Sequence, residues 1–386
     1  MKHTVVRVAT LSVLISALSA CGMYTSSDRS SDFRTHYQMV NADNVKRHAV
    51  AKGVYELVYS PSLNAIFVAS SGGWGDQADT PKILQINPTT LDIELEIPLQ
   101  RKAFGLALDD QAQRLYVGNT VDTSLTVVDI PTQREVGIIQ LEEKTKGPDG
   151  KLRYARDLRQ LVVDPANRRV YVGAHGTEAG SVMYVINTDT LQIEKKIEGL
   201  GKAKAPGIWL DASGNRLFVS NLLGEILTID TRSLEIAQRF KTDIEQPMNM
   251  VLDPATNRLF VTDQGSASLT GYLSKVVPDF VSNGKGNRVV VLDADTGKEQ
   301  ASFATGEGPL QIALDAQRKR LYVTNRAAGT VSVHHSNTYA LLDEISLPTH
   351  PNTMARDPRQ NLLFVTVKNG DNDPKDAKEG VAKIPF

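Results

Sequence analysis

A short pattern returns seven times along the 386-residue chain, and this repetition limits the possible folds more than any other feature. In "LALDDQAQRLYVGN" and "LVVDPANRRVYVGA", an apolar run reaches an Asp, a polar turn follows, and a second apolar run contains an aromatic residue. The aromatic residues of the seven copies are Phe67, Tyr116, Tyr171, Phe218, Phe260, Tyr322 and Phe364. The residues seven positions before them are Ser60, Asp109, Asp164, Asp211, Asp253, Asp315 and Asp357. A pattern kept at a fixed offset indicates a repeat architecture.

Each copy extends to four strands. A third apolar run such as "SLTVVD" follows, and after a polar turn comes a fourth such as "EVGIIQL". Four antiparallel strands at this spacing predict an all-β fold, a β-propeller with seven four-stranded blades. The last copy ends before a fourth strand, and "KRHAVA" (46–51) could supply it. We therefore expect an N-terminal strand to pair with the last blade, which closes the ring and removes an open sheet edge.

The second strands also carry a family resemblance. "LYVTN" (321–325), "LFVTD", "LFVSN" and "LYVGN" resemble the YVTN-repeat family of seven-bladed β-propellers. Within it, "AKGVYELVYS" and "THPNTMARDPRQNLLFVTVKNG" are similar to the periplasmic YncE-like propellers, over roughly residues 45–386. The resemblance implies the fold and the subfamily. It implies no activity, because the YVTN residues serve packing and turns.

The N-terminal segment has the composition of an export signal. Basic residues precede the apolar run "VATLSVLISALSA" (8–20), which is too short to span a bilayer as a stable anchor. The run ends in "LSAC", which resembles a bacterial lipobox, and Cys21 is the only cysteine of the chain. Gly22 after this cysteine favours the outer membrane over retention in the inner membrane.

We accordingly expect three regions. Residues 1–20 form a lipoprotein signal peptide, residues 21–35 form a Ser-rich flexible tether that begins at the lipid-modified Cys21, and residues 36–386 form one propeller domain. The expected location is the periplasmic side of the bacterial envelope, attached to the membrane by the lipid, as a monomer.

Composition excludes several classes of function. Loss of residues 1–20 leaves 41 basic and 44 acidic residues, a formal net charge of −3, so no global basic field points to nucleic acid. One cysteine allows neither a disulfide framework nor a zinc site of several cysteines. The sequence contains no haem-attachment motif and no Gly-rich phosphate loop before a helix. We assign no catalytic residue, no metal ligand and no cofactor.

The meander of four strands sorts the connections onto two faces. Turns between first and second strands and between third and fourth strands share one face, which we call the short-turn face. The other connections share the opposite face, which we call the long-loop face. Every long insertion falls on the second set: 70–81, 142–159, 174–181, 263–287 and 368–380. Since function tends to lie in variable loops on a rigid scaffold, the long-loop face is the candidate binding face.

The first strands predict a polar ring around the central channel. The positions four residues before the repeated Asp or Ser are never large and apolar, whereas the next positions always are apolar. The members of this polar ring are Glu56, Gly105, Gln160, Gly207, Asn249, Gln311 and Thr353. The candidates for ligand binding at the channel mouth are Glu56, Gln160, Asn249, Gln311, Asn352 and Thr353.

A basic cluster with aromatic residues marks the loops of the same face. The candidates for binding there are Trp74, Lys102, Arg153, Tyr154, Arg156, Arg159 and Lys204. Charge and stacking of this kind could bind phosphate, carboxylate or single-stranded DNA, although nearby acidic residues dilute the charge.

Three functions follow from these features. The leading hypothesis is a non-enzymatic, lipid-anchored binding or scaffold propeller that recognises a small ligand or an envelope protein across the long-loop face. The second is a metal-dependent hydrolase of the lactonase type at the channel mouth, for which Glu56 is the only charged ring member. The third is binding of single-stranded DNA or another polyanion by the basic segment 144–159.

Overall fold

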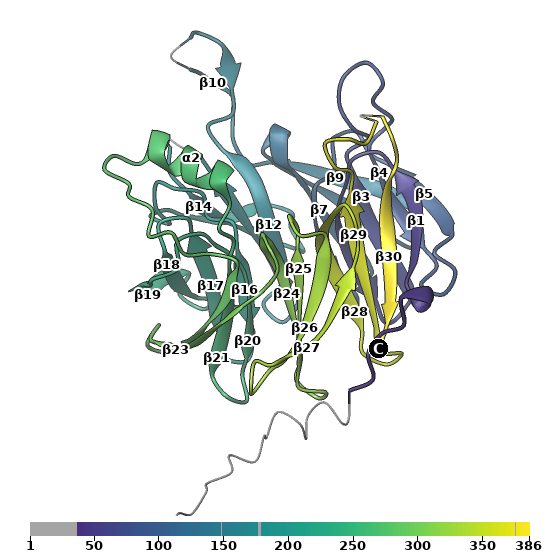
Figure 1. Ribbon diagram of the computed structural model, residues 1–386. Helices are drawn as coiled ribbons and strands as arrows, with labels where there is room; N and C mark the ends of the chain where they lie inside the picture. The colour runs from purple at the N-terminus through teal and green to yellow at the C-terminus, as the bar shows by residue number, and fades with distance from the viewer. Residues whose placement is uncertain (1–36, 148, 177–178, 375) are drawn as a thin grey trace, which may run out of the picture.

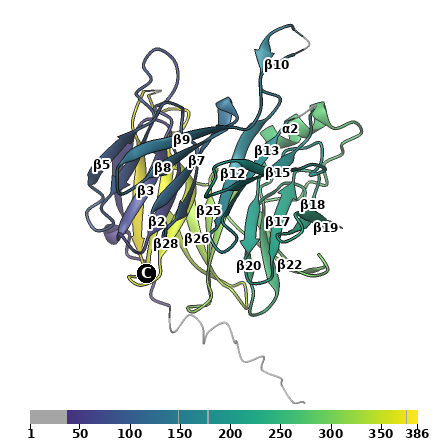
Figure 2. The same ribbon diagram turned by 180° about the vertical axis from the view of Figure 1, so that it is seen from behind.

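The computed structural model describes residues 37–147, 149–176, 179–374 and 376–386. They form seven four-stranded antiparallel sheets arranged in a ring, as predicted (Figures 1 and 2). The first strand of each sheet contacts the first strands of the two neighbouring sheets, so these strands line the central channel. The signal peptide predicted for residues 1–20 and the tether predicted for residues 21–35 lie outside the described residues.

The blades follow the chain order. From the innermost to the outermost strand, the first four are β2 (Val54–Ser60), β3 (Ala65–Ser70), β4 (Lys82–Ile86) and β5 (Ile93–Pro98); β6 (Gly105–Asp109), β7 (Arg114–Asn119), β8 (Ser124–Asp129) and β9 (Arg134–Gln140); β12 (Asp157–Asp164), β13 (Arg169–His175), β14 (Val182–Asn187) and β15 (Ile193–Ile197); and β16 (Ile208–Asp211), β17 (Arg216–Asn221), β18 (Glu225–Asp230) and β19 (Glu235–Lys241).

The remaining blades are built in the same way. They are β20 (Pro247–Asp253), β21 (Arg258–Asp263), β22 (Arg288–Asp293) and β23 (Glu299–Ala304); β24 (Pro309–Asp315), β25 (Arg320–Asn325), β26 (Thr330–His335) and β27 (Leu341–Ser346); and β28 (His350–Asp357), β29 (Leu362–Lys368), β30 (Glu379–Pro385) and β1 (Lys46–Ala51). Outside the blades lie a hairpin of β10 (Thr145–Lys146) and β11 (Leu152–Arg153), the helix α2 (Ala267–Val276), and the 3-10 turns η1 (Ala42–Asn44) and η2 (Thr120–Asp122). No helix among the described residues is long and apolar enough to cross a membrane.

The repeated residues serve packing and turns. All seven aromatic residues are almost completely buried, and the apolar residues that follow the polar ring are buried as well. In all six repeated aspartates, Oδ1 accepts a hydrogen bond from a backbone N–H two or three residues further on, as Asp253 does from Ala255. Four residues after each Asp or Ser the backbone is left-handed, with φ of 48° to 56°; four of the seven residues there are Asn, which tolerates this conformation.

The ring closes where the first and last strands of the propeller meet. β1 pairs antiparallel with β30, from Lys46 opposite Lys383 to Ala51 opposite Glu379. The predicted strand 46–51 is therefore confirmed as the fourth strand of the last blade. This pairing covers an edge of β30 that would otherwise present unpaired backbone groups.

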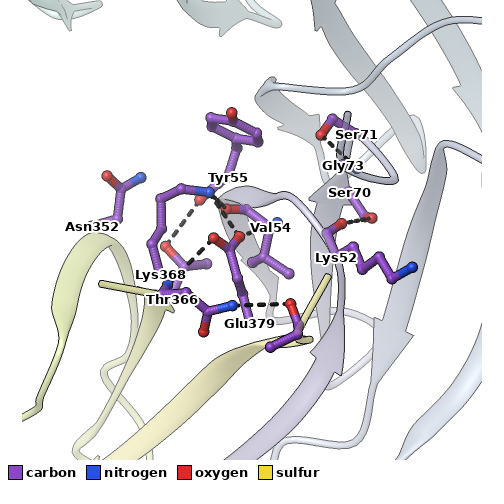
Figure 3. Close-up of polar contacts among 12 residues, drawn as sticks. Lys52, Val54, Tyr55, Ser70, Ser71, Gly73, Asn352, Thr366, Lys368 and Glu379 are labelled. Carbon is purple, nitrogen blue, oxygen red and sulfur yellow. Dashed lines mark hydrogen bonds and ion pairs between the residues drawn. The ribbon is translucent and has the colours of Figure 1, made fainter. Parts of the chain in front are cut away.

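A buried ion pair joins the last blade to the first at this closure (Figure 3). The Glu379 carboxylate accepts hydrogen bonds from Lys368 Nζ (2.7 Å) and from the backbone N–H of Val54 (2.6 Å). Lys368 Nζ also donates to the Val54 carbonyl (2.7 Å) and lies 3.8 Å from the centre of the Tyr55 ring. We call Lys368, Glu379 and Val54 the clasp. Because the clasp uses both backbone groups of one residue, it fixes the position where the first blade begins.

We predict that Glu379→Ala lowers the free energy of unfolding by roughly 3 kcal/mol or more, because it leaves a buried ammonium group without its carboxylate. Glu235→Ala, which breaks the exposed Lys195–Glu235 pair, should cost below about 1 kcal/mol. Urea unfolding measures both changes. Equal losses in the two variants would show that the clasp contributes no more than a surface pair.

Candidate functional site

The long connections gather at one end of the ring, as the strand order predicted. The β10–β11 hairpin, α2 and the insertions after β3 and β29 all project from this end, while the described connections at the other end are tight turns (Figures 1 and 2). Two cavities open on the long-loop face. One, of about 680 Å³, lies between the hairpin segment and Tyr272 of α2, and we call it the hairpin cleft. The other, of about 310 Å³, lies over the channel, and we call it the mouth cavity.

The two cavities bring together many of the residues singled out in the sequence. The predicted residues that line the mouth cavity are Glu56, Trp74, Arg159, Lys204, Asn352 and Thr353. Those that line the hairpin cleft are Arg153, Tyr154, Arg156 and Lys204. The cavities share Asp157, His175 and Lys204, so they form a continuous hollow. Lys102, Gln160, Asn249 and Gln311 line neither of these two cavities.

The polar ring connects the blades. Glu56 Oε2 accepts a hydrogen bond from the N–H of Leu106 (3.0 Å), and Gln160 Oε1 accepts one from that of Ile208 (2.9 Å). Asn249 Nδ2 donates to the Leu310 carbonyl (2.8 Å). Each of these bonds reaches the innermost strand of the next blade, so the ring members are first of all ties between blades.

Thr353 completes this pattern, and the two glycines of the ring make room for it. Thr353 Oγ1 donates to the Tyr55 carbonyl (3.0 Å) across the closure. A Cβ atom at Gly105 would lie 2.6 Å from Leu161 Cδ2, and one at Gly207 would lie 1.9 Å from the Met248 carbonyl oxygen. Close approach of adjacent blades therefore requires glycine at these two positions. A further role of the ring in ligand binding stays a prediction.

Trp74 stands at the rim of the mouth cavity. It is 59% exposed, its ring lies 6.0 Å from that of Phe104, and Lys102 Nζ lies 5.0 Å from its centre. Lys102 Nζ also donates to the carbonyls of Ser71 and Gly73 in the same loop. Lys102 thus holds the Trp74 loop in place, and the indole is neither buried as a hydrophobic plug nor free of support.

The basic segment 144–159 is less basic in the structure than in the sequence. Arg156 pairs with the Glu142 carboxylate and donates to the Gly180 carbonyl (2.8 Å). Arg153 pairs with Asp149 (2.6 Å). Two of the three arginines proposed to bind a polyanion are therefore already neutralised. The third, Arg159, leaves this cluster, since β12 carries it into the mouth cavity.

Charges inside the mouth cavity have shifted pKa values. Burial raises the pKa of the Glu56 carboxyl to about 7, although the Leu106 N–H and the charge of Arg159 act to lower it. Burial, together with the charges of Lys204 and Arg159, lowers the pKa of His175 to about 3, so this imidazole is neutral at physiological pH. Burial also lowers the pKa of the Arg159 guanidinium.

The structure adds residues that sequence reasoning missed. Tyr55 and Phe104 line the mouth cavity, and their rings meet edge to face at 4.6 Å. Arg326 Nη1 donates to Asn352 Oδ1 (2.7 Å) and orients that amide. Tyr55 and Phe104 each directly precede a member of the polar ring, so reading one position back along the first strands would have found them. Arg326 follows the sixth second strand and carries no such signal.

Among the described residues, no group of three or more His, Cys, Asp or Glu side chains is placed to hold a metal ion. Within the lining of the mouth cavity, Glu56 and Asp157 are the carboxylates.

Comparison with known proteins identifies relatives of the whole propeller. The chain is 30% identical over 350 residues to the "Uncharacterized protein YncE" of Salmonella typhimurium, a match that covers 89% of this chain and 90% of that one. It is 31% identical over 345 residues to the YncE protein of Escherichia coli K12, covering 88% and 89%. A solved chain of Kuenenia stuttgartiensis hydrazine synthase shares the fold, with a TM-score of 0.64 at 16% identity over 82% of this chain and 92% of that one. No protein-family model matches.

We predict that Glu56→Gln changes the pH dependence of stability. In the folded protein the pKa of Glu56 is about 7, against an ordinary value of 4.5, so the folded state holds the proton more tightly than the unfolded state. The contribution of Glu56 to stability is therefore present below pH 4.5 and is lost as the pH rises through about 7. Glu56→Gln should raise the melting temperature at pH 8 and leave it nearly unchanged at pH 4.5.

Melting curves at the two pH values test this, with exposed Glu299→Gln as the control. A shift for Glu56→Gln that is the same at both pH values would contradict the assignment of this pKa to the Glu56 carboxyl.

Proposed function

We propose that this chain, which belongs to the YncE family of seven-bladed β-propellers, is a non-enzymatic binding or scaffold protein of the bacterial cell envelope. It recognises a small ligand or a partner protein through the long-loop face and the channel mouth, and a lipid on Cys21 attaches it to the periplasmic side of the membrane. The observation that carries the proposal is the concentration of long connections and of the hollow formed by the two cavities on one face.

The arrangement of the hollow supports binding more than it supports hydrolysis. A hydrolytic metal ion needs several acidic or imidazole ligands. In the mouth cavity Glu56 already accepts a backbone hydrogen bond from the next blade, and Asp157 stands at the exposed rim. The aromatic rings of Tyr55, Trp74 and Phe104 instead provide a surface of the kind that holds an organic ligand or a protein side chain.

The path of the N-terminal segment supports an outward orientation of this face. Residues 37–45 reach β1 from the short-turn side, next to the C-terminus (Figure 1). There, the Asp343 carboxylate accepts hydrogen bonds from the Tyr37 hydroxyl (3.1 Å) and the Val40 N–H (2.8 Å). A lipid anchor at Cys21 would therefore attach at the short-turn face and leave the long-loop face directed away from the bilayer.

We predict that photocrosslinking in intact cells captures a partner from one face only. A benzophenone amino acid at Leu152 or Val281, which are 62% and 85% exposed on long-loop insertions, should give a defined adduct, and its yield should fall in a Trp74→Ala background. The same probe at Leu63 or Ile193, at turns of the short-turn face, is the matched control. Equal adducts from the control positions would contradict the assignment of the binding face.

The anchor can be tested with the single cysteine. We predict that the Cys21→Ser protein moves from the detergent phase to the aqueous phase in a Triton X-114 partition, because it cannot be lipidated. In the lipidated protein, Cys21 is blocked, so Leu63→Cys or Val281→Cys can be labelled selectively. On vesicles that contain a headgroup quencher, a fluorophore at position 63 should be quenched more than one at position 281. The reverse order would contradict the proposed orientation.

A further inference from the structure

The cations of the mouth cavity are not paired with its carboxylates. Arg159 lies in the cavity with no ion pair or hydrogen bond to its guanidinium among the described contacts, and Glu56 is the one carboxylate whose charge acts on it. Lys204 has its Nζ 4.9 Å from the centre of the Tyr272 ring and is paired with no carboxylate within salt-bridge distance in the described residues. By contrast, Arg156 and Lys368 each have a carboxylate partner.

A neutral donor faces the same space. Arg326 Nη1 donates to Asn352 Oδ1, which fixes the amide so that its Nδ2 group, with two N–H donors, is turned away from the arginine. Asn352 lines the mouth cavity, as does Tyr55 (Figure 3). Burial lowers the pKa of Arg326, and the charge of Arg159 adds to that effect, so the two guanidinium groups lie close enough to repel each other.

Unpaired cations withdrawn from water that repel each other are costly unless an anion joins them. We propose that the mouth cavity binds a small organic anion, a carboxylate or phosphate attached to an apolar ring. Arg159 and Lys204 contact the anionic group, Asn352 Nδ2 donates to it, and the ring rests against Phe104 and Trp74. This inference rests on the proposed function, because it names the ligand class for the channel mouth.

The size and the walls of the cavity fit such a ligand. A volume of about 310 Å³ is at the lower end for organic ligand sites, so it suits a single ring with its substituent rather than a polymer. Phe104 and Val121 supply apolar surface on the side where Trp74 forms the rim. A guanidinium donates two parallel hydrogen bonds to a carboxylate or phosphate, which gives such anions a preference over halide.

Glu56 makes binding sensitive to pH. Its carboxyl shares the cavity with Arg159, so an ionised Glu56 competes with the ligand for this guanidinium, whereas a protonated Glu56 does not. The other titratable groups that face the cavity are Tyr55, Asp157, Arg159, His175 and Lys204. Of these, His175 is neutral across the range in which Glu56 titrates, because its pKa is about 3. We therefore expect affinity to fall as Glu56 ionises and the fall to be absent in Glu56→Gln.

Calorimetric titration of the purified protein tests the proposal with defined probes. Benzoate and phenyl phosphate should bind, and benzyl alcohol, which has the ring without the charge, should not. Arg159→Gln should weaken binding at least about tenfold, the size of one lost charge-assisted pair of hydrogen bonds. Arg232→Gln, an exposed arginine in a turn of the short-turn face, should bind as the wild type does. At pH 8 Glu56→Gln should bind more tightly than the wild type, with no such gain at pH 5.5.

Three results would overturn the proposal. They are equal binding by Arg159→Gln and the wild type, equal binding of benzyl alcohol and benzoate, and no binding of either anion at concentrations up to about 10 mM. Binding of oligo(dT) without binding of the small anions would also overturn it and would assign the face to a polyanion. If the anions fail while crosslinks from positions 152 and 281 persist, the anion pocket is rejected and the proposed function stands. Loss of the crosslinks alone rejects the function as a protein scaffold.

Discussion

The whole structure depends on closure of the ring. Six blades complete themselves with consecutive strands, but the seventh takes its outer strand, β1, from the N-terminal side of the propeller. Strand pairing closes the sheet, and the clasp of Lys368, Glu379 and Val54 joins that sheet to the first blade. An ion pair that gains both backbone groups of one residue repays more of its desolvation cost than an isolated pair would. Everything that lies over the channel depends on this joint, because Tyr55 and Glu56 directly follow Val54.

The molecule separates stability from recognition by face. On the short-turn face, the aspartates and left-handed residues of the repeat form nearly identical tight turns, which leave little room for variation. On the long-loop face, the same scaffold accepts a hairpin, a helix and several longer loops without disturbing the strands. The polar ring lies between the two and serves both. Its side chains tie each blade to the next, and Glu56 and Thr353 also line the mouth cavity.

Much of the fold could be predicted because the repeat is a local pattern. The offset between Asp253 and Phe260 sets a turn and a buried strand, and its sevenfold recurrence counts the blades. The strand at 46–51 could be predicted because the last blade lacked one. The helix α2 could not, since one turn of apolar residues around Leu273 in a polar insertion gives only a weak period, and its stability comes from contacts with Leu222 and Leu310.

The candidate site was predictable in part for a related reason. Glu56, Asn352 and Thr353 belong to first strands, whose direction follows from the repeat, so their place at the channel mouth could be inferred. The separation of Arg159 from Arg156 could not, because it depends on where β12 begins. Pairing of Arg156 with Glu142 likewise depends on how the connection folds back over β14, where Tyr184 also donates to Glu142. Sequence shows the charges of a loop, and only the fold shows which of them remain unpaired.

The most direct test of anion binding at the channel mouth is a crystal structure of the protein with phenyl phosphate. We predict density for the ligand in the mouth cavity, with its phosphate between Arg159, Lys204 and Asn352 and its ring against Phe104. Ligand density on the short-turn face, or an empty mouth cavity with the ligand bound elsewhere on the molecule, would contradict this prediction.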